Sequence, residues 1–147
     1  MVVGGVVERN TIPASNITIM TLSVSITAFN GEPLIRKCLE SVQWADEIIV
    51  VDSGSTDRTR EIARELGAKV TQTPDFPGYG QQKNRALDRT TSDWVLALDH
   101  DEWVSPELRD EILAVIRDPD PKAAKAAYAM PRSSNFCGRY MRHEIGR

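Results

Sequence analysis

The chain has 147 residues, of which 41% are hydrophobic and 27% charged, and its formal net charge at pH 7 is −3. This length suits one domain with a substantial core, and the composition is ordinary for a globular protein. No apolar run reaches the roughly 20 residues that a membrane-spanning helix needs. The acidic balance and the lack of interleaved aromatic and basic residues argue against a nucleic-acid-binding protein.

The charge is unevenly distributed along the chain. Residues 1–121 carry 12 basic and 20 acidic side chains (net −8), whereas residues 122–147 carry six basic and one acidic (net +5). Such a run is most often a solvated surface. The alternative is a surface that meets an anion, either a phosphorylated substrate or the lipid at the inner face of a membrane. We expect a cytoplasmic protein, with peripheral membrane association on the second interpretation.

From residue 22 onward, strand-like and helix-like segments alternate. Short apolar runs predict strands at Leu22–Ala28, Glu47–Val51, Ala68–Thr73 and Trp94–Leu98, and a further strand within Ala126–Pro131. Capping and helical spacing predict helices after Asn30-Gly31, after Ser55-Thr56, over residues 81–90 and after Ser105-Pro106. Residues 1–19 do not fit this plan and are expected to form a disordered extension, which leaves residues 20–147 as the domain.

The alternation predicts an α/β fold with three layers, α/β/α, around a mostly parallel sheet. Right-handed crossovers most simply give the strand order 3-2-1-4. Ligands in such sheets bind beyond the carboxyl ends of the strands, where the order reverses, which is here between the first and fourth strands. The residues that end these strands and the second one are therefore expected at one edge of the sheet.

An acidic cluster follows the fourth strand. Asp99 and Asp101 flank His100, and two carboxylates on one side of a turn suit a hard divalent cation whose shell is completed by a diphosphate. The alternative is that the aspartates only cap the next helix. Because Ser105 and Pro106 already fit the cap and the first helical position, the metal site is the favoured interpretation. His100 is expected to be exposed rather than a ligand.

The turn that begins at Asp52 and ends at Asp57 has two interpretations of equal weight. Asp52 either accepts a hydrogen bond from a base N–H or a ribose hydroxyl, or belongs to ordinary turn and capping chemistry. A phosphate cradle at this helix start is disfavoured, because Asp57 would repel the anion. In the helix over residues 81–90, Lys83 or Arg85 could reach a nucleotide, although each would more often be solvated.

With these residues in view, the chain resembles the family 2 glycosyltransferases, which have the GT-A fold, from about Leu22 to its end. The resemblance is carried by four segments in order, SITAFNGE, ADEIIVVDSGSTDRTREIARELGA, GYGQQKNRAL and DWVLALDHDEWVSPELRDEI. In detail the chain is most similar to the lipopolysaccharide core glucosyltransferases, whose tryptophan positions are filled here by Trp44 and Trp103. His100 departs from that pattern, which usually has alanine.

The resemblance implies a Rossmann-like nucleotide-sugar-binding domain and an inverting sugar transfer. The implied donor is a UDP-sugar, in particular UDP-glucose, and the implied acceptor is the lipopolysaccharide core or a similar glycan. Asp99 would approach the ribose, and Asp101 would hold Mg²⁺ or Mn²⁺ on the diphosphate, where the cation stabilises the leaving UDP.

The resemblance also implies a uridine site lined by Thr27, Phe29 and Asp52, with Lys83 as a basic contact to the nucleotide. Family members continue well beyond residue 147, and that second part supplies the acceptor groove and the catalytic base. The chain is therefore expected to be the donor-binding half, truncated on the acceptor side.

An inverting transfer needs a base that deprotonates the acceptor hydroxyl. Glu102 and Glu144 are the spare carboxylates nearby, but neither is predicted to be the base, so the catalytic residue is left unassigned. The alternative function is a non-catalytic nucleotide-sugar-binding module, whose open face a homodimer could cover. A metal-dependent nucleotidyltransferase is less favoured, because residues 30–33 (NGEP) do not form a glycine-rich, basic phosphate loop.

Overall fold

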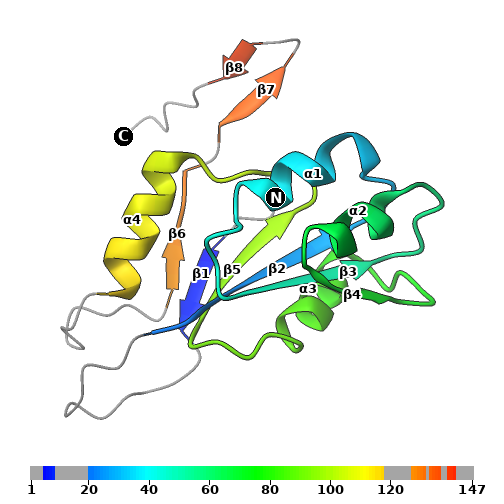
Figure 1. The fold of residues 1–147 in the computed structure, drawn as a ribbon, viewed down its shortest axis with the longest axis horizontal. Coiled ribbons are helices and arrows are strands. Elements are labelled where there is room, and N and C mark those ends of the chain that lie inside the picture. The colour runs from blue at the N-terminus through cyan, green and yellow to red at the C-terminus, as the bar shows by residue number, and fades with distance from the viewer. Residues whose placement is uncertain (1–4, 9–19, 118–126, 132, 137–138, 142–147) are drawn as a thin grey trace.

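The protein is described by a computed structural model that covers residues 5–8, 20–117, 127–131, 133–136 and 139–141 (Figure 1). The strands are β1 (Gly5–Glu8), β2 (Leu22–Ala28), β3 (Glu47–Asp52), β4 (Lys69–Gln72), β5 (Trp94–Asp99), β6 (Ala127–Ala129), β7 (Ser134–Phe136) and β8 (Arg139–Met141). The helices are α1 (Glu32–Glu40), α2 (Thr59–Glu65), α3 (Tyr79–Leu87) and α4 (Pro106–Ile116). No helix within these ranges has the length and apolar character needed to cross a membrane.

Six of the strands form one sheet in the order β4-β3-β2-β5-β1-β6. The four strands β4, β3, β2 and β5 are mutually parallel, which confirms the predicted order 3-2-1-4. β1 pairs antiparallel with both β5 and β6. β7 and β8 form a separate antiparallel pair. The reversal of strand order therefore lies between β2 and β5, as expected.

β1 was not predicted. Residues 1–19 were expected to form a disordered extension, whereas Gly5–Glu8 pairs with β5 and β6 in a register that places Val6 opposite Leu96 and Tyr128. Four residues carry little local signal for a strand, and the pairing partners lie about 90 and 120 positions away in the chain, so sequence reasoning missed it. β6 confirms the further strand predicted within Ala126–Pro131.

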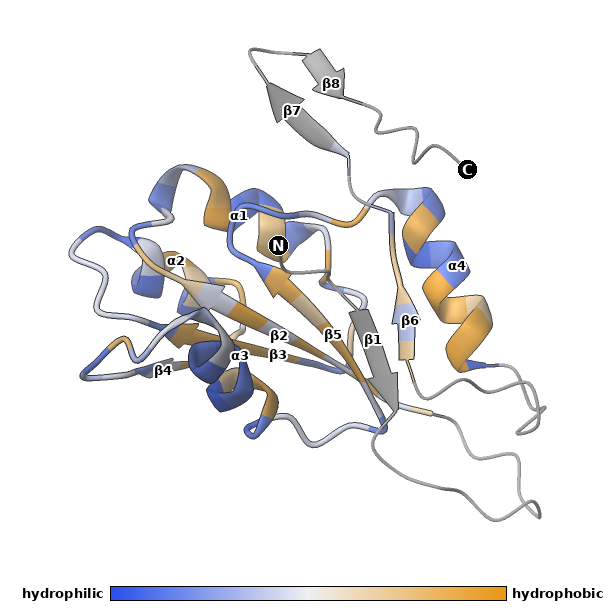
Figure 2. Ribbon diagram, turned by 180° about the vertical axis from the view of Figure 1, so that it is seen from behind, coloured by the Kyte–Doolittle hydropathy of each residue, from blue (hydrophilic) through white to orange (hydrophobic). Residues whose placement is uncertain are grey.

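Alternation along the strands sorts side chains to the two faces of the sheet. The main core contains even-numbered residues of β2, β3 and β5 together with residues of α1, α2 and α4. On the other face, Ile49 and Val51 of β3 pack with Ala86 of α3. The result is the predicted three-layer arrangement, and Figure 2 shows the hydrophobic β2, β3 and β5 between helices that carry hydrophilic residues.

The helix starts follow the sequence signals only in part. Ser105 Oγ accepts a hydrogen bond from Leu108 N at 3.2 Å, which confirms the predicted cap of α4. α2, in contrast, begins at Thr59 rather than directly after Ser55. The Ser55 hydroxyl is engaged elsewhere, because it donates to Asp52 and accepts from the backbone N–H of Asn30.

Candidate nucleotide-sugar site

The strand register brings Thr27 and Asp99 together at the carboxyl edge of the sheet. The two residues are partners in the parallel pair β2/β5, and Thr27 Oγ1 donates a hydrogen bond to Asp99 Oδ1 at 2.8 Å. Lys83 of α3, which packs on β2, β3 and β5, places its Nζ 2.9 Å from the same oxygen. Three predicted site residues from three distant segments therefore meet at one point.

The Lys83 ammonium is buried against this edge. Its Nζ makes the ion pair with Asp99, but no hydrogen bond of good geometry to a described residue. An ammonium has three N–H donors, and burying one without partners is costly. Within the described residues, the Lys83 ammonium therefore keeps N–H donors beyond those that face Asp99.

Asp101 lies exposed at the tip of the turn that follows β5, while the Asp99 side chain is 27% exposed. The turn is closed by Glu102, whose backbone N–H donates to Asp99 O at 3.0 Å and whose Oε2 accepts the backbone N–H of Asp99 at 2.8 Å. Glu102 therefore shapes the turn, and its carboxylate points back toward the strand end.

The oxygen donors of this turn fit a divalent cation bound jointly with a ligand. Among the described residues, no group of three or more His, Cys, Asp or Glu side chains could hold a metal ion. Mg²⁺ commonly takes only one or two carboxylates and completes its shell with waters and phosphate oxygens. Asp99 and Asp101 match that donor set, provided that a diphosphate supplies the remaining ligands.

Asp52 does not join this cluster. Its side chain is fully buried, and its Oδ1 accepts the backbone N–H groups of Gly54 and Ser55 at 3.1 and 2.9 Å. Oδ2 accepts the Ser55 hydroxyl, and Arg60 Nε of α2 lies 3.6 Å from Oδ1. These are the contacts of the turn-and-capping interpretation, and they leave no exposed oxygen for a base or ribose.

Asp52 is separated from Thr27 and Asp99 because side chains along a strand alternate between the two faces of the sheet. Asp52 is even-numbered in β3, like the core residues Ile48 and Val50 that belong with α1 and α2. Thr27 and Asp99 are odd-numbered and point toward α3. Proximity at one sheet edge was predicted, but the two faces of that edge were not distinguished.

The start of α1 is joined to the start of α2 by hydrogen bonds. Asp57 Oδ2 accepts the backbone N–H of Glu32 at 3.0 Å, and Glu32 Oε2 accepts the backbone N–H of Arg58 at 3.0 Å. Asp57 Oδ1 also accepts the backbone N–H of Thr59 at 3.0 Å. Backbone N–H groups at these two helix starts thus donate to carboxylates, as in ordinary capping chemistry.

Arg85 and Lys83 have different surroundings, although their positions on the predicted helix did not distinguish them and only the family resemblance favoured Lys83. Arg85 forms a two-point ion pair with Asp75, with distances of 2.9 Å (Nη1–Oδ1) and 3.1 Å (Nη2–Oδ2). This pair fastens the loop that precedes α3. In that loop Phe76 packs edge-on against Tyr79 with ring centroids 5.1 Å apart, and both rings are exposed.

Phe29 and His100 complete the surroundings of the edge. Phe29 is 54% exposed, which keeps its ring available to a ligand, as predicted for a residue at the mouth of the site. His100 is half-buried rather than exposed, because its ring packs against Gly31.

Two side chains have strongly shifted pKa values: Cys38, close to the aspartates of the site, and Glu47, at the opposite edge of the sheet. Burial, helped by the charges of Asp101 and Asp99, raises the pKa of the Cys38 thiol to about 12. At the amino end of β3, burial acts to raise the pKa of Glu47, but hydrogen bonds from Lys69, Ser23 and the Thr91 N–H outweigh it and lower that pKa to about 2. Cys38 is therefore a neutral core thiol and Glu47 a charged structural group.

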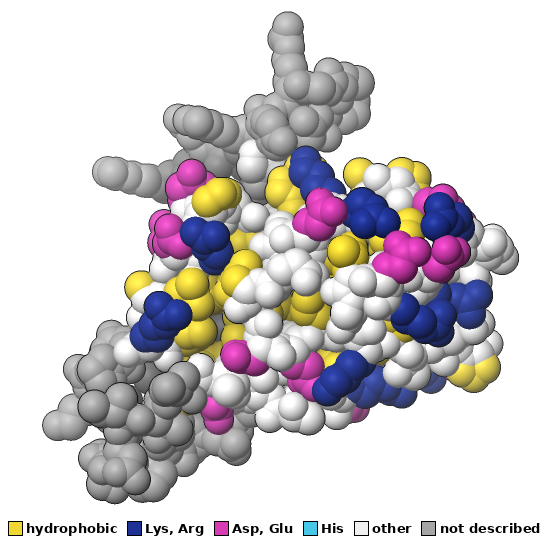
Figure 3. Space-filling model, viewed as in Figure 1, with side chains coloured by type: hydrophobic (Ala, Val, Ile, Leu, Met, Phe, Trp, Pro, Cys, Tyr) yellow, Lys and Arg dark blue, Asp and Glu magenta, His cyan; other side chains and the backbone are white. Residues whose placement is uncertain are grey.

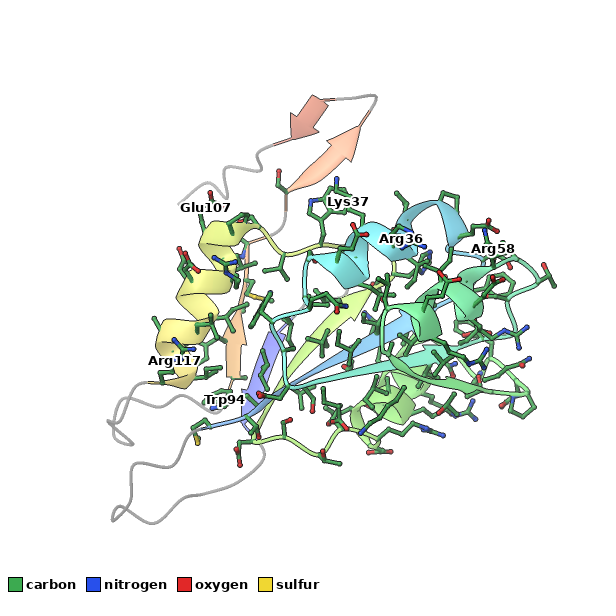
Figure 4. All side chains as sticks on the ribbon, viewed as in Figure 1. Arg36, Lys37, Arg58, Trp94, Glu107 and Arg117 are labelled. Carbon is green, nitrogen blue, oxygen red and sulfur yellow. The ribbon has the colours of Figure 1, made fainter. Side chains whose placement is uncertain are left out.

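The basic side chains on α1 and α2 belong to the surface rather than the site. Figure 4 shows Arg36 and Lys37 projecting from α1 and Arg58 from the position just before α2. Arg36 pairs with Glu65 and Arg58 with Glu61, at 3.2 and 3.0 Å. Figure 3 shows the same mixture of acidic and basic side chains over this face.

Several predictions fall outside the described residues. Glu144 is among them, as are the basic residues at 122, 125, 132, 142 and 147. The proposed role of the basic tail and the second carboxylate considered as a base therefore stay predictions.

The comparisons with known proteins agree with this arrangement. The model of glycosyl transferase family 2 matches residues 23–144. An uncharacterised glycosyltransferase of Rickettsia typhi is 47% identical over 92 residues, which are 62% of this chain and 31% of that protein. The lipopolysaccharide core biosynthesis glycosyltransferase LpsC of Rhizobium meliloti is 34% identical over 102 residues, covering 65% of this chain and 38% of that protein.

Solved structures give the same answer. Residues 1–349 of TarS from S. aureus superpose with a TM-score of 0.58 at 31% identity, covering 66% of this chain and 32% of that one. Glucosyl-3-phosphoglycerate synthase of Mycobacterium tuberculosis, crystallised with Mn²⁺ and UDP, superposes with a TM-score of 0.50 at 35% identity, covering 55% and 33%. The chain thus spans about a third of the length of these relatives. Together, the sheet order, the residues gathered between β2 and β5, and the match over most of the sequence show that this chain belongs to glycosyl transferase family 2.

Proposed function

We propose that this chain binds a UDP-sugar together with Mg²⁺ or Mn²⁺ and forms the donor side of an inverting glycosyltransferase. The observation that carries the proposal is the meeting of Thr27, Lys83 and Asp99, two residues before the exposed Asp101, where the strand order reverses. In open α/β sheets this is the position at which ligands bind. The donor side is therefore assigned to the edge between β2 and β5.

Each residue has a role that its surroundings permit. The buried Lys83 ammonium donates to nucleotide oxygens, and the exposed Phe29 ring offers a face to the base. Asp99 and Asp101 hold the cation, which when bound supplies positive charge to the diphosphate as it leaves. Asp52 is assigned to shaping its turn instead of contacting uridine, because both of its oxygens are engaged.

The choice of nucleotide and metal is supported by the related structures. TarS was crystallised in complex with UDP, and glucosyl-3-phosphoglycerate synthase with Mn²⁺ and UDP-glucose. Glucose as the sugar and a lipopolysaccharide core as the acceptor form the finer part of the proposal. The similarity to LpsC, named for lipopolysaccharide core biosynthesis, supports the acceptor.

The proposal is tested by calorimetric titration of the chain with UDP, with and without Mn²⁺. Wild type should bind more tightly with the metal, and Asp101→Ala should remove that gain. Asp110→Ala is the matched control, because Asp110 is an exposed aspartate on α4 whose carboxylate pairs with Arg109 instead. A folded wild type that binds no UDP, or an Asp101→Ala variant with full metal dependence, would contradict the proposal.

The second candidate function is a nucleotide-sugar-binding module without catalysis. It is favoured by one observation: the Glu102 carboxylate accepts the backbone N–H of Asp99 and faces back into its turn. A base must instead reach the acceptor hydroxyl. Release of free sugar or transfer to a glycan by this chain would decide for the enzyme and would contradict the module.

A further inference from the structure

We infer that His100 is a positioning residue that, through its contact with Gly31, fixes the turn of Asp99–Asp101 against the loop that carries Phe29. His100 directly follows Asp99, so alternation sends its side chain to the α1 face while Asp99 points toward Lys83. A Cβ atom added at Gly31 would lie 2.3 Å from His100 Cδ2 and 2.9 Å from Cγ. The imidazole therefore fills the space that a side chain at position 31 would need.

The need for glycine at position 31 is steric. Gly31 has φ −99° and ψ 13°, values in the bridge region, where residues with a side chain occur, for instance within type I turns, so its backbone does not by itself require glycine. Gly54 is the opposite case, since its φ is +98° and nothing lies within 4 Å of an added Cβ. The contact with His100 is therefore the reason that position 31 is glycine. Once the imidazole is removed, alanine should be tolerated at this position.

The backbone of Gly31 is held in place by three hydrogen bonds, which oppose its retreat from the imidazole. Its N–H donates to Thr59 Oγ1 at 2.8 Å, and its carbonyl accepts the N–H groups of Leu34 and Ile35 at 2.9 and 2.8 Å. Carbon atoms in contact lie about 3.5–4.0 Å apart, so a methyl group at position 31 would have to displace the imidazole by about 1 Å or more.

The turn would move with the imidazole. The backbone N–H of His100 donates to Thr27 O at 3.2 Å, so the residue is tied to β2 as well as to β5. The contact thus adds a side-chain constraint on the separation between the exposed Phe29 ring and the two aspartates, which this hydrogen bond also restrains. The inference rests on the proposed function, in which Phe29 faces the base and the aspartates face the cation, and it adds the pair that fixes the spacing between them.

The test compares Gly31→Ala, His100→Ala and the double variant by titration with UDP, with and without Mn²⁺. Mn²⁺ should increase the affinity of wild type for UDP, and Gly31→Ala should reduce this increase about tenfold. The reason is that a displacement of binding groups by about 1 Å weakens the interactions that depend on their geometry. The affinity of Gly31→Ala for UDP without metal should change much less. His100→Ala alone should lower the increase from Mn²⁺ less than Gly31→Ala does, because it leaves a space instead of a clash, and the double variant should match His100→Ala. A general loss of structure would lower the UDP affinities with and without Mn²⁺ together. The ratio of these two affinities therefore separates an effect on positioning from an effect on folding.

Two glycines provide matched controls. Gly54→Ala should destabilise through its backbone, and adding His100→Ala should not rescue it. Gly80→Ala, at a position with open space in α3, should leave the metal dependence unchanged. The inference is overturned if Gly31→Ala keeps the metal dependence of wild type, or if the double variant stays as low as Gly31→Ala.

Thermal unfolding of the same variants without ligand separates this inference from the proposed function. Gly31→Ala should lower the Tm, and the double variant should return to the Tm of His100→Ala. If wild type binds no UDP, the proposed function fails and the positioning role fails with it, whereas the recovery of Tm still shows the contact. If UDP binds but neither Tm nor metal dependence recovers, only the positioning role is rejected.

Discussion

Replacing Asp57 by alanine should measure how strongly the starts of α1 and α2 are joined. The carboxylate accepts the backbone N–H groups of Glu32 and Thr59, each at 3.0 Å, and also the hydroxyl of Thr59. Removing a cap costs about 1 kcal/mol per helix start. Because two helix starts lose an acceptor and the side chain is half-buried, we expect the free energy of unfolding to fall by about 1–2 kcal/mol.

The assay is urea unfolding at pH 7, analysed as a two-state transition with equal m-values. Asp57→Asn is the matched variant, since it keeps one acceptor oxygen and should lose less than Asp57→Ala. Thr56→Ala, next in the chain and exposed, should stay within about 0.5 kcal/mol of wild type. A loss below about 0.5 kcal/mol for Asp57→Ala would refute the assignment of Asp57 as the joint between the two helices.

The same variant carries a pH signature. Burial acts to raise the pKa of Asp57, but the hydrogen bonds from Thr59 and Glu32 outweigh it and lower that pKa below its usual value. A carboxyl whose pKa is lower in the folded state stabilises the protein above its unfolded pKa, and that stability is lost as the pH falls through the folded pKa. The difference between wild type and Asp57→Ala should therefore shrink below about pH 4. A difference that stays constant down to pH 2 would contradict this account.

Three further predictions concern single side chains. Glu47→Gln should lower the free energy of unfolding at pH 7 by about 1–2 kcal/mol, a figure reduced for the solvent exposure of the ion pair. Because the folded pKa of Glu47 is about 2, the difference from wild type in urea unfolding should narrow as the pH falls from about 4.5 toward 2. Lys83→Met should weaken UDP binding about tenfold in calorimetry, whereas Arg85→Met, which frees Asp75, should mainly lower the Tm. In a Cys137→Ser background, Cys38 should react with a thiol reagent at pH 8 only at the rate of unfolding, since its pKa of about 12 keeps it protonated; fast labelling would contradict its burial.

The sequence by itself determined the parallel part of the fold. The apolar runs and capping signals carry local information, because a buried strand is apolar at nearly every position and a helix start needs an acceptor for its free N–H groups. The order β4-β3-β2-β5 then followed from the handedness of the crossovers, which the chain cannot easily violate. For the same reason the strand ends that carry Thr27 and Asp99 were predicted at one edge before their contact was known, whereas Lys83 was assigned to the site only by the family resemblance.

Only the tertiary structure decided what each side chain does there. Asp52 and Asp99 both end parallel strands, but side chains alternate between the two faces of a sheet, so these aspartates lie on opposite faces. Asp52 is therefore engaged in its own turn, whereas Asp99 forms an ion pair with Lys83. Likewise, no local pattern reveals that Gly31 is glycine because the imidazole of His100 lies against it. The two residues are 69 positions apart, and steric exclusion exists only once packing has brought them together.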